Sequence, residues 1–351
     1  MKTALARVSF CQNQAIMYRL MTFTIFSIIS GLFIFRPVHS KSPFKKDAIA
    51  IHFALVKDFS VNETTIINIA TQRTSDQLQQ ISQAYESRYG EKLLNDIRDY
   101  LTGKFEEMIT SLFMDDTDFY AEELYNNLRG FKDDEKVFID ILLTQNHVKL
   151  QEIKDVYKKN YLNSLEHDFQ KFTTKNSKKL YITLLQGERN ETMVINYIRA
   201  EHDARQLYNA AITQSTEVNP DVFINILTSV SYDQLRHTVM KFFDIFGEHI
   251  ETVIEKNFTG DFARALIAIV EYAKSRDGFI ANRLYDSLEY DFDHRSIIRL
   301  MIISKNIGIY SIREAIQIRH RIALEYFLNQ TPNGGFRNTI LKFLFPNYPT
   351  S

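Results

Sequence analysis

Cysteine, proline and tryptophan are scarce in this chain, and the scarcity narrows the kinds of protein it can be. There is one cysteine, Cys11, no tryptophan, and only six prolines in 351 residues. A chain that loses Cys11 needs no particular redox compartment. Six prolines are too few to interrupt many helices. No segment shows the sustained polar–apolar alternation of strands, so the sequence predicts an all-α protein.

A long basic run is also absent. The formal net charge is −1, and it falls to about −5 without the first forty residues, which carry four cations and no acid. A mildly acidic body lacks the electrostatic footprint of a nucleic-acid-binding protein. It is also poorly suited to attach to anionic lipid by charge alone, which requires clustered Lys and Arg.

The acid-free N-terminus resembles a targeting segment. Residues 20–35 form an uncharged run that follows Arg19, and Ser40 offers a small residue for cleavage. We therefore expect a secretory signal peptide over residues 1–40, with Met17 as an alternative start. The run is shorter than the roughly 20 residues that span a bilayer. A retained membrane anchor through residues 20–35 and a buried apolar tail are the alternatives.

A repeated pattern organises the rest of the chain. The segment LQQISQAYESRYGEKLLNDI, which starts at Leu78, returns from Leu150 as LQEIKDVYKKNYLNSLEHDF. Weaker copies start at Leu235 and Ile309. A long fixed period indicates an array of similar modules. The expected divisions are residues 41–115, 116–188, 207–274 and 275–345, with a linker at 189–206 and a tail at 346–351.

The second module shows the local pattern most clearly. Thr117 is expected to cap a first helix that closes at Gly130. Apolar residues at helical spacing predict four further helices between Gly130 and Leu185. Asn219 and Pro220 predict a helix start in the third module, since Asn caps and Pro fits the first turn. The recurring tyrosines, Tyr85, Tyr89, Tyr157 and Tyr161, are interpreted as core or inter-helix contacts.

The segments LRGFKDDEKVFIDILLTQ, LQEIKDVYKKNY and LYITLLQGERNE resemble an annexin repeat, and the resemblance covers residues 46–345. It implies an array of four five-helix repeats forming one curved body. It also implies a protein that binds acidic phospholipid through calcium. In that family each repeat offers a G-x-G-T loop, and a carboxylate about 40 residues later completes the calcium shell. Calcium requires six to eight oxygens, so both parts matter.

This chain departs from the calcium pattern in every module. The degenerate loop positions are Ser60, Gly130, Lys132, Glu217 and Asp291. The four acid positions hold Tyr100, Phe172, Asn257 and Thr331. None of the four acid positions carries a carboxylate, and Lys132 places a cation where the ion belongs. We expect no calcium at these loops and no other cofactor. The glycines of Thr102-Gly103 and Thr259-Gly260 are interpreted as helix-joining turns.

Other candidate sites give weaker signals. Four N-glycosylation sequons occur, at Asn62, Asn190, Asn257 and Asn329. The acidic cluster around Asp291 and Asp293 is better explained as a solvated loop than as a weak calcium site. His167-Asp168 lies in the repeated helix, and the chain has no metalloprotease or nucleophile motif, so no catalytic residues are expected.

The sequence therefore predicts a secreted, non-enzymatic, annexin-like protein that binds an unidentified protein, glycan or membrane surface. The alternative is a calcium-dependent phospholipid binder that uses residual side-chain sites.

Overall fold

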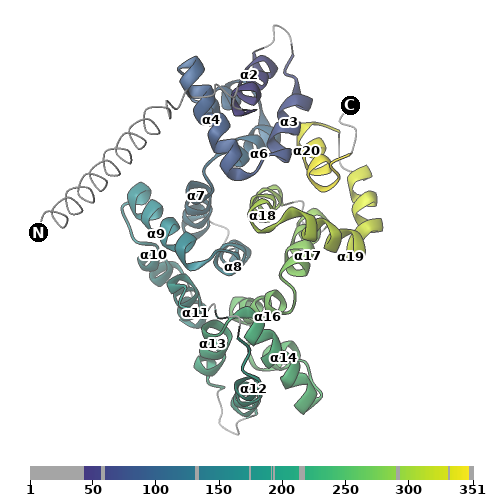
Figure 1. Ribbon diagram of the computed structural model, residues 1–351. Coiled ribbons are helices and arrows are strands. Elements are labelled where there is room, and N and C mark those ends of the chain that lie inside the picture. The colour runs from purple at the N-terminus through teal and green to yellow at the C-terminus, as the bar shows by residue number, and fades with distance from the viewer. Residues whose placement is uncertain are drawn as a thin grey trace, which may run out of the picture. The chain divides into compact units, whose positions relative to one another are not determined.

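The computed structural model describes residues 43–56, 60–130, 134–173, 175–190, 192, 194–212, 218–289, 293–330 and 333–347. Every regular element in these ranges is an α-helix, which confirms the all-α prediction (Figure 1). The chain divides into two compact units, residues 1–46 and 47–351. Most of the first unit lies outside the described residues, including the whole candidate signal peptide.

The first three modules contain five helices each. Module one has α2 (Pro43–Leu55), α3 (Glu63–Gln72), α4 (Ser75–Tyr89), α5 (Leu93–Tyr100) and α6 (Gly103–Phe113). Module two has α7 (Asp116–Arg129), α8 (Glu135–Thr144), α9 (His147–Tyr161), α10 (Leu165–Phe172) and α11 (Lys175–Gln186). Module three has α12 (Tyr197–Ala211), α13 (Pro220–Ser229), α14 (Tyr232–Phe246), α15 (Ile250–Asn257) and α16 (Gly260–Lys274).

The fourth module has four described helices instead of five. They are α17 (Arg276–Glu289), α18 (His294–Ile307), α19 (Ile309–Gln330) and α20 (Gly335–Leu344). In the first three modules the third helix ends at a residue in the left-handed conformation, Gly90, Leu162 or Gly247. The corresponding position in module four is Arg321, inside α19. Helix α19 contains no Gly or Pro, and it continues through this position without a break.

Side-chain caps mark the start of several helices, α4 and α13 among them. Thr74 forms a capping box with Gln77 at the start of α4, and Asn219 accepts from the amide of Asp221 at the start of α13. The expected cap of α7 is wrong by two residues. Asp115 caps this helix by accepting from the amide of Thr117 at 2.9 Å. Thr117 is instead buried in the first turn, where its hydroxyl accepts from Lys149.

The third helix of each of the first three modules buries one apolar face in the core. Ile81, Ile153 and Leu235 on these helices are fully buried. A stacked pair of rings joins the first helix to the third in three modules, with centroids 3.7–3.8 Å apart: His52 on Tyr89, Tyr125 on Tyr161, and Tyr208 on Phe246. This placement fits the interpretation of the recurring tyrosines as packing residues.

Modules also pack against each other within residues 47–351. Helix α16 contacts α8 and α11, α20 contacts α3, and α18 contacts α6 and α8. Contacts of α18 therefore reach modules one and two, far from it in sequence (Figure 1).

Candidate functional site: the acid positions and a central charge network

The acid positions of the first three modules occupy the same place in the fold. Tyr100, Phe172 and Asn257 are the last residues of α5, α10 and α15, the fourth helix of each module. Tyr100 is 46% exposed and Phe172 is 36% exposed, so both rings reach solvent where the family pattern needs a carboxylate. Phe172 supplies no oxygen for calcium, and Tyr100 supplies a phenolic hydroxyl in place of a bidentate carboxylate.

Cations surround the ring of Phe172. The ammonium of Lys171 lies 5.0 Å from its centroid, and the guanidinium of Arg129 lies 5.7 Å away. These are cation–π distances, and they place positive charge beside a position that would need negative charge to hold a metal. The acid position of module two therefore has two cations beside it and no carboxylate of its own, although Arg129 also pairs with Asp168.

Asn257 in module three is tied to its own helix. Its side-chain amide nitrogen donates to the carbonyl of Val253 at 2.8 Å. The remaining amide oxygen is neutral, so it cannot replace a bidentate carboxylate. The same hydrogen bond uses the nitrogen that a glycan would modify.

The loop positions are only partly described. Ser60 is exposed, and Gly130 ends α7 in an extended conformation with φ −77°. Lys132, Glu217, Asp291 and Thr331 lie outside the described residues. Asp293 caps α18, accepting from both the amide and the hydroxyl of Ser296, which limits its use as a metal ligand. The two Thr-Gly turns join helices, with Gly103 at φ 65° and Gly260 at φ 66°.

Two other sequons lie in exposed parts of the fold. Asn62 is exposed and caps α3 by accepting from the amide of Thr65. Asn190 is exposed and its oxygen accepts from the amide of Thr192. Asn329 lies in α19, and its side chain is outside the described set. Glycosylation at these positions stays a prediction.

Within the described ranges, no cluster of three or more His, Cys, Asp or Glu side chains is arranged to hold a metal ion. No helix within them is both long and apolar enough to cross a bilayer.

The repeated Tyr and Asp positions form a hydrogen-bonded unit. The hydroxyl of Tyr157 donates to Asp168 at 2.7 Å, and Arg129 pairs with the same carboxylate at 3.2 Å. In module one, the hydroxyl of Tyr85 donates to Asp96. Burial and the hydrogen bond to Asp168 both raise the pKa of Tyr157. The unit ties α9 to α10, and it uses Asp168, while His167 is exposed and takes no part.

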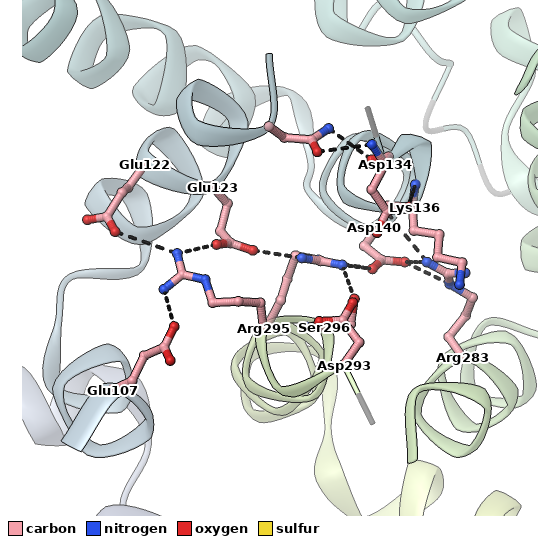
Figure 2. A network of polar contacts seen from close by, with 12 residues as sticks. Glu107, Glu122, Glu123, Asp134, Lys136, Asp140, Arg283, Asp293, Arg295 and Ser296 are labelled. Carbon is pink, nitrogen blue, oxygen red and sulfur yellow. Dashed lines mark hydrogen bonds and ion pairs between the residues drawn. The ribbon is translucent and has the colours of Figure 1, made fainter. Parts of the chain in front are cut away.

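A charge network at the contact of α18 with modules one and two was not anticipated from the sequence. Figure 2 shows arginines of α17 and α18 reaching carboxylates on α6, α7 and α8. Arg299 is 1% exposed, and it donates to Glu123 at 2.7 Å and to Asp140 at 3.0 Å. Arg283 donates to the second oxygen of Asp140 at 2.9 Å.

The more exposed arginine of this network, Arg295, also pairs with carboxylates. Arg295 donates to Glu107 at 2.8 Å and contacts Glu123 as well (Figure 2). Burial alone would lower the pKa of Arg299, but the charges of Asp140 and Glu123 outweigh it, and the pKa is raised. Because its carboxylates are already held by guanidinium groups, the network acts as a joint between modules one, two and four.

The sequence carried one signal of this network. Asp140 interrupts the apolar run VFIDILL, and Arg299 interrupts SIIRLMII. Charged residues inside apolar runs are rarely left buried without a partner. The pairing itself joins positions 159 residues apart, so no local pattern could reveal it.

These features define a class: an all-α array of helical modules with short turns at the ends of the fourth helices. The annexin family model matches residues 46–112, 119–184 and 202–269. The chain belongs to the annexin family.

Known annexins are similar to this chain along most of its length. Human annexin A13 is 30% identical over 289 residues, covering 82% of this chain and 91% of its own. The solved structure of annexin III superposes with a TM-score of 0.79 at 28% identity, covering 86% of this chain and 93% of that one. A calcium-bound annexin (Sm)1 structure gives a TM-score of 0.77 at 25% identity, covering 87% and 91% of the two chains.

Proposed function

We propose that this annexin is a non-enzymatic, secreted protein that binds a surface partner without calcium at the family's main loops. The observation that carries the proposal is the chemistry of the acid positions. Tyr100, Phe172 and Asn257 end their helices without a carboxylate, and Lys171 and Arg129 flank Phe172. Calcium binding depends on oxygen ligands that offset the loss of its hydration shell. The described residues at these positions do not fit that ion.

The partner is a protein, a glycan or a membrane surface. A body with a net charge of about −5 and no basic run gives little attraction to anionic lipid. Glycans at Asn62, Asn257 or Asn329, the sequons at or next to the loop and acid positions, would stand between the protein and a bilayer. Attachment through shape and neutral polar contacts is therefore favoured over attachment by net charge.

The alternative is calcium-dependent phospholipid binding, the typical activity of annexins. One similar structure is described as calcium-bound, and this chain keeps an acidic segment from Glu289 to Asp293. Against this alternative, Asp293 already caps α18.

Sedimentation with phosphatidylserine vesicles, with calcium and then with a chelator, separates the two functions. We expect the same small pelleted fraction in both conditions. Isothermal titration should show no calcium binding tighter than about 100 μM, the range of protein sensor sites. Calcium-dependent pelleting would establish the alternative function instead.

Secretion is proposed on the sequence of the N-terminus alone. Cleavage after Ser40 would release a chain that begins at Lys41, just before α2. N-terminal sequencing of protein from its native source tests this. An intact Met1 or Met17 on soluble protein would reject it.

A further inference from the structure

A cavity of about 340 Å³ lies among modules two, three and four, away from the acid positions. Its wall comes from the turn before α9, the link after α11, the turn before α14 and the start of α17. Two guanidinium groups line it, from Arg189 and Arg276, and we call it the arginine cavity. Neither the charge network nor the calcium pattern explains it.

Arg189 is fixed in place by backbone carbonyls. It donates to Val230 at 2.5 Å and to Leu227 at 2.7 Å, both at the C-terminal end of α13. Its guanidinium also lies 4.0 Å from the ring centroid of Tyr232. The two carbonyls take two of its five N–H donors, and Tyr232 is a further hydrogen-bond partner. A cation near a helix C-terminus is also favourable. The carbonyls orient the group, but they do not neutralise its charge.

Arg276 brings a second positive charge to the same ring. Its guanidinium lies 5.4 Å from the centroid of Tyr232. Among the described residues, neither Arg276 nor Arg189 forms an ion pair with a carboxylate, although most other arginines do. Burial lowers the pKa of Arg189, and the charge of Arg276 lowers it further. Two like charges held beside one ring gain from an anion between them.

Three helices present their N-termini to the arginine cavity. Asn146 and His147 begin α9, Ser231 and Tyr232 begin α14, and Arg276 begins α17. In each of them one first-turn amide is already capped by a side chain: Asn146 caps α9, Ser231 caps α14 and Ser275 caps α17. The other first amides have no intrahelical acceptor, and the helix dipole makes this end positive. The wall of the cavity therefore combines two guanidinium groups with three positive helix ends.

Carboxylates near the cavity do not cancel this charge. Asp233 lines it but pairs with Arg236 at 3.2 Å. Glu188 also lines it and is exposed, as Arg276 is, so solvent screens both charges. Arg189 is the less exposed of the two cations, and no carboxylate among the described residues pairs with it.

We propose that the arginine cavity binds a phosphate group, carried by a soluble phosphomonoester or by a phosphomonoester lipid headgroup. A phosphate carries about −1.5 to −2 charges near pH 7 and accepts several strong hydrogen bonds. Guanidinium groups and helix N-termini are suited to such an anion. Arg276 is free to close on the ligand, while Arg189 is held ready by α13. The site needs no calcium. The headgroup source would make it a route to the membrane partner of the proposed function, whereas binding of a soluble phosphomonoester does not rest on that function.

Isothermal titration of the full chain with glycerol 3-phosphate tests the soluble source. Flotation with phosphatidic acid vesicles in chelator tests the headgroup. Arg276→Gln removes one cation from an exposed side chain that forms no ion pair among the described residues and lies over the ring of Tyr232, so the fold should be little affected. Arg88→Gln is the matched control, because Arg88 is exposed and lies 5.7 Å from the ring of Tyr89 in module one.

We expect saturable binding in at least one of the two assays. Arg276→Gln should weaken it about tenfold, the effect of losing one charge-assisted hydrogen bond. Arg276→Glu should abolish it, and Arg88→Gln should leave it unchanged. The assay that shows saturation identifies the source of the phosphate. Absence of saturable binding in both assays, or equal losses with Arg276→Gln and Arg88→Gln, would overturn the proposal.

Discussion

At the scale of single residues, Lys305 is a lysine whose ammonium group is largely shielded from water by the fold. Its ammonium donates to the carbonyl of Ala70, which joins α18 to α3. Burial lowers the pKa of Lys305 from 10.5 to about 7, although the nearby charge of Asp116 acts in the opposite direction. Between these two pKa values the unfolded chain holds the proton and the folded chain does not. The free energy of unfolding therefore rises with pH across this window and is lowest below pH 7.

The substitution Lys305→Met should flatten this dependence. From pH 7 to pH 9 the wild type should gain on the order of 2 kcal/mol relative to the variant, at about 1.4 kcal/mol per fully developed pH unit. Urea unfolding at both pH values measures the difference. Lys159→Met is the control, because Lys159 is exposed near the end of α9. Parallel profiles for wild type and Lys305→Met would show that Lys305 is not the titrating group.

At the scale of elements, α9 shows which contacts a sequence repeat predicts and which contacts it does not predict. The matched Tyr85 and Tyr157, and the matched Asp96 and Asp168, were visible as recurring letters. The structure joins them into the same hydrogen bond in both modules. The bond partner of Asp168 in module two, Arg129, has no such signal, because it comes from another helix. Recurrence therefore predicted the positions, and tertiary packing supplied the partners.

The apolar face of α9 can be tested directly. Ile153 is fully buried, so Ile153→Asp places a carboxylate in the core of module two without a partner. We expect a loss on the order of 3 kcal/mol or more in the free energy of unfolding. Lys159→Asp on the exposed side of the same helix should cost far less. Similar melting temperatures for the two variants would mean that the buried face of α9 is assigned wrongly.

A calcium site should be recoverable at the end of α10. Phe172→Glu restores the missing carboxylate, and Lys132→Gly removes a cation from the loop after α7. We expect the double variant to bind calcium measurably tighter than the wild type, since calcium affinity follows the charge and number of oxygen ligands. Phe172→Glu alone should gain less. Calcium titration of the three proteins measures this order, and an unchanged double variant would mean that the loop backbone itself no longer fits the ion.

At the scale of the whole chain, the sequence predicted the helical modules but not how they are joined. Local caps and apolar spacing determine helices such as α13, where Asn219 and Pro220 mark the start. The sequence predicted two helices where the structure has the single helix α19, because the repeat pattern continues through that segment. The arginine cavity and the charge network combine residues from three modules, and their geometry depends on packing that no single segment encodes.

The charge network offers the sharpest test of how the modules hold together. Arg299→Met leaves Glu123 and Asp140 buried without that cation, and we expect a loss of about 3–5 kcal/mol in the free energy of unfolding. The control Arg205→Met breaks an exposed pair with Glu201 and should cost less than about 0.5 kcal/mol.

Adding Glu123→Gln and Asp140→Asn to Arg299→Met removes the unpaired charges. This triple variant should recover part of the loss, because the main penalty is an uncompensated buried carboxylate and not a missing attraction. Urea unfolding of the wild type and the three variants measures both effects. If Arg299→Met were no worse than Arg205→Met, the carboxylates would have found water or Arg283 and Arg295 as sufficient partners, and the joint would depend on apolar contacts of α18 instead.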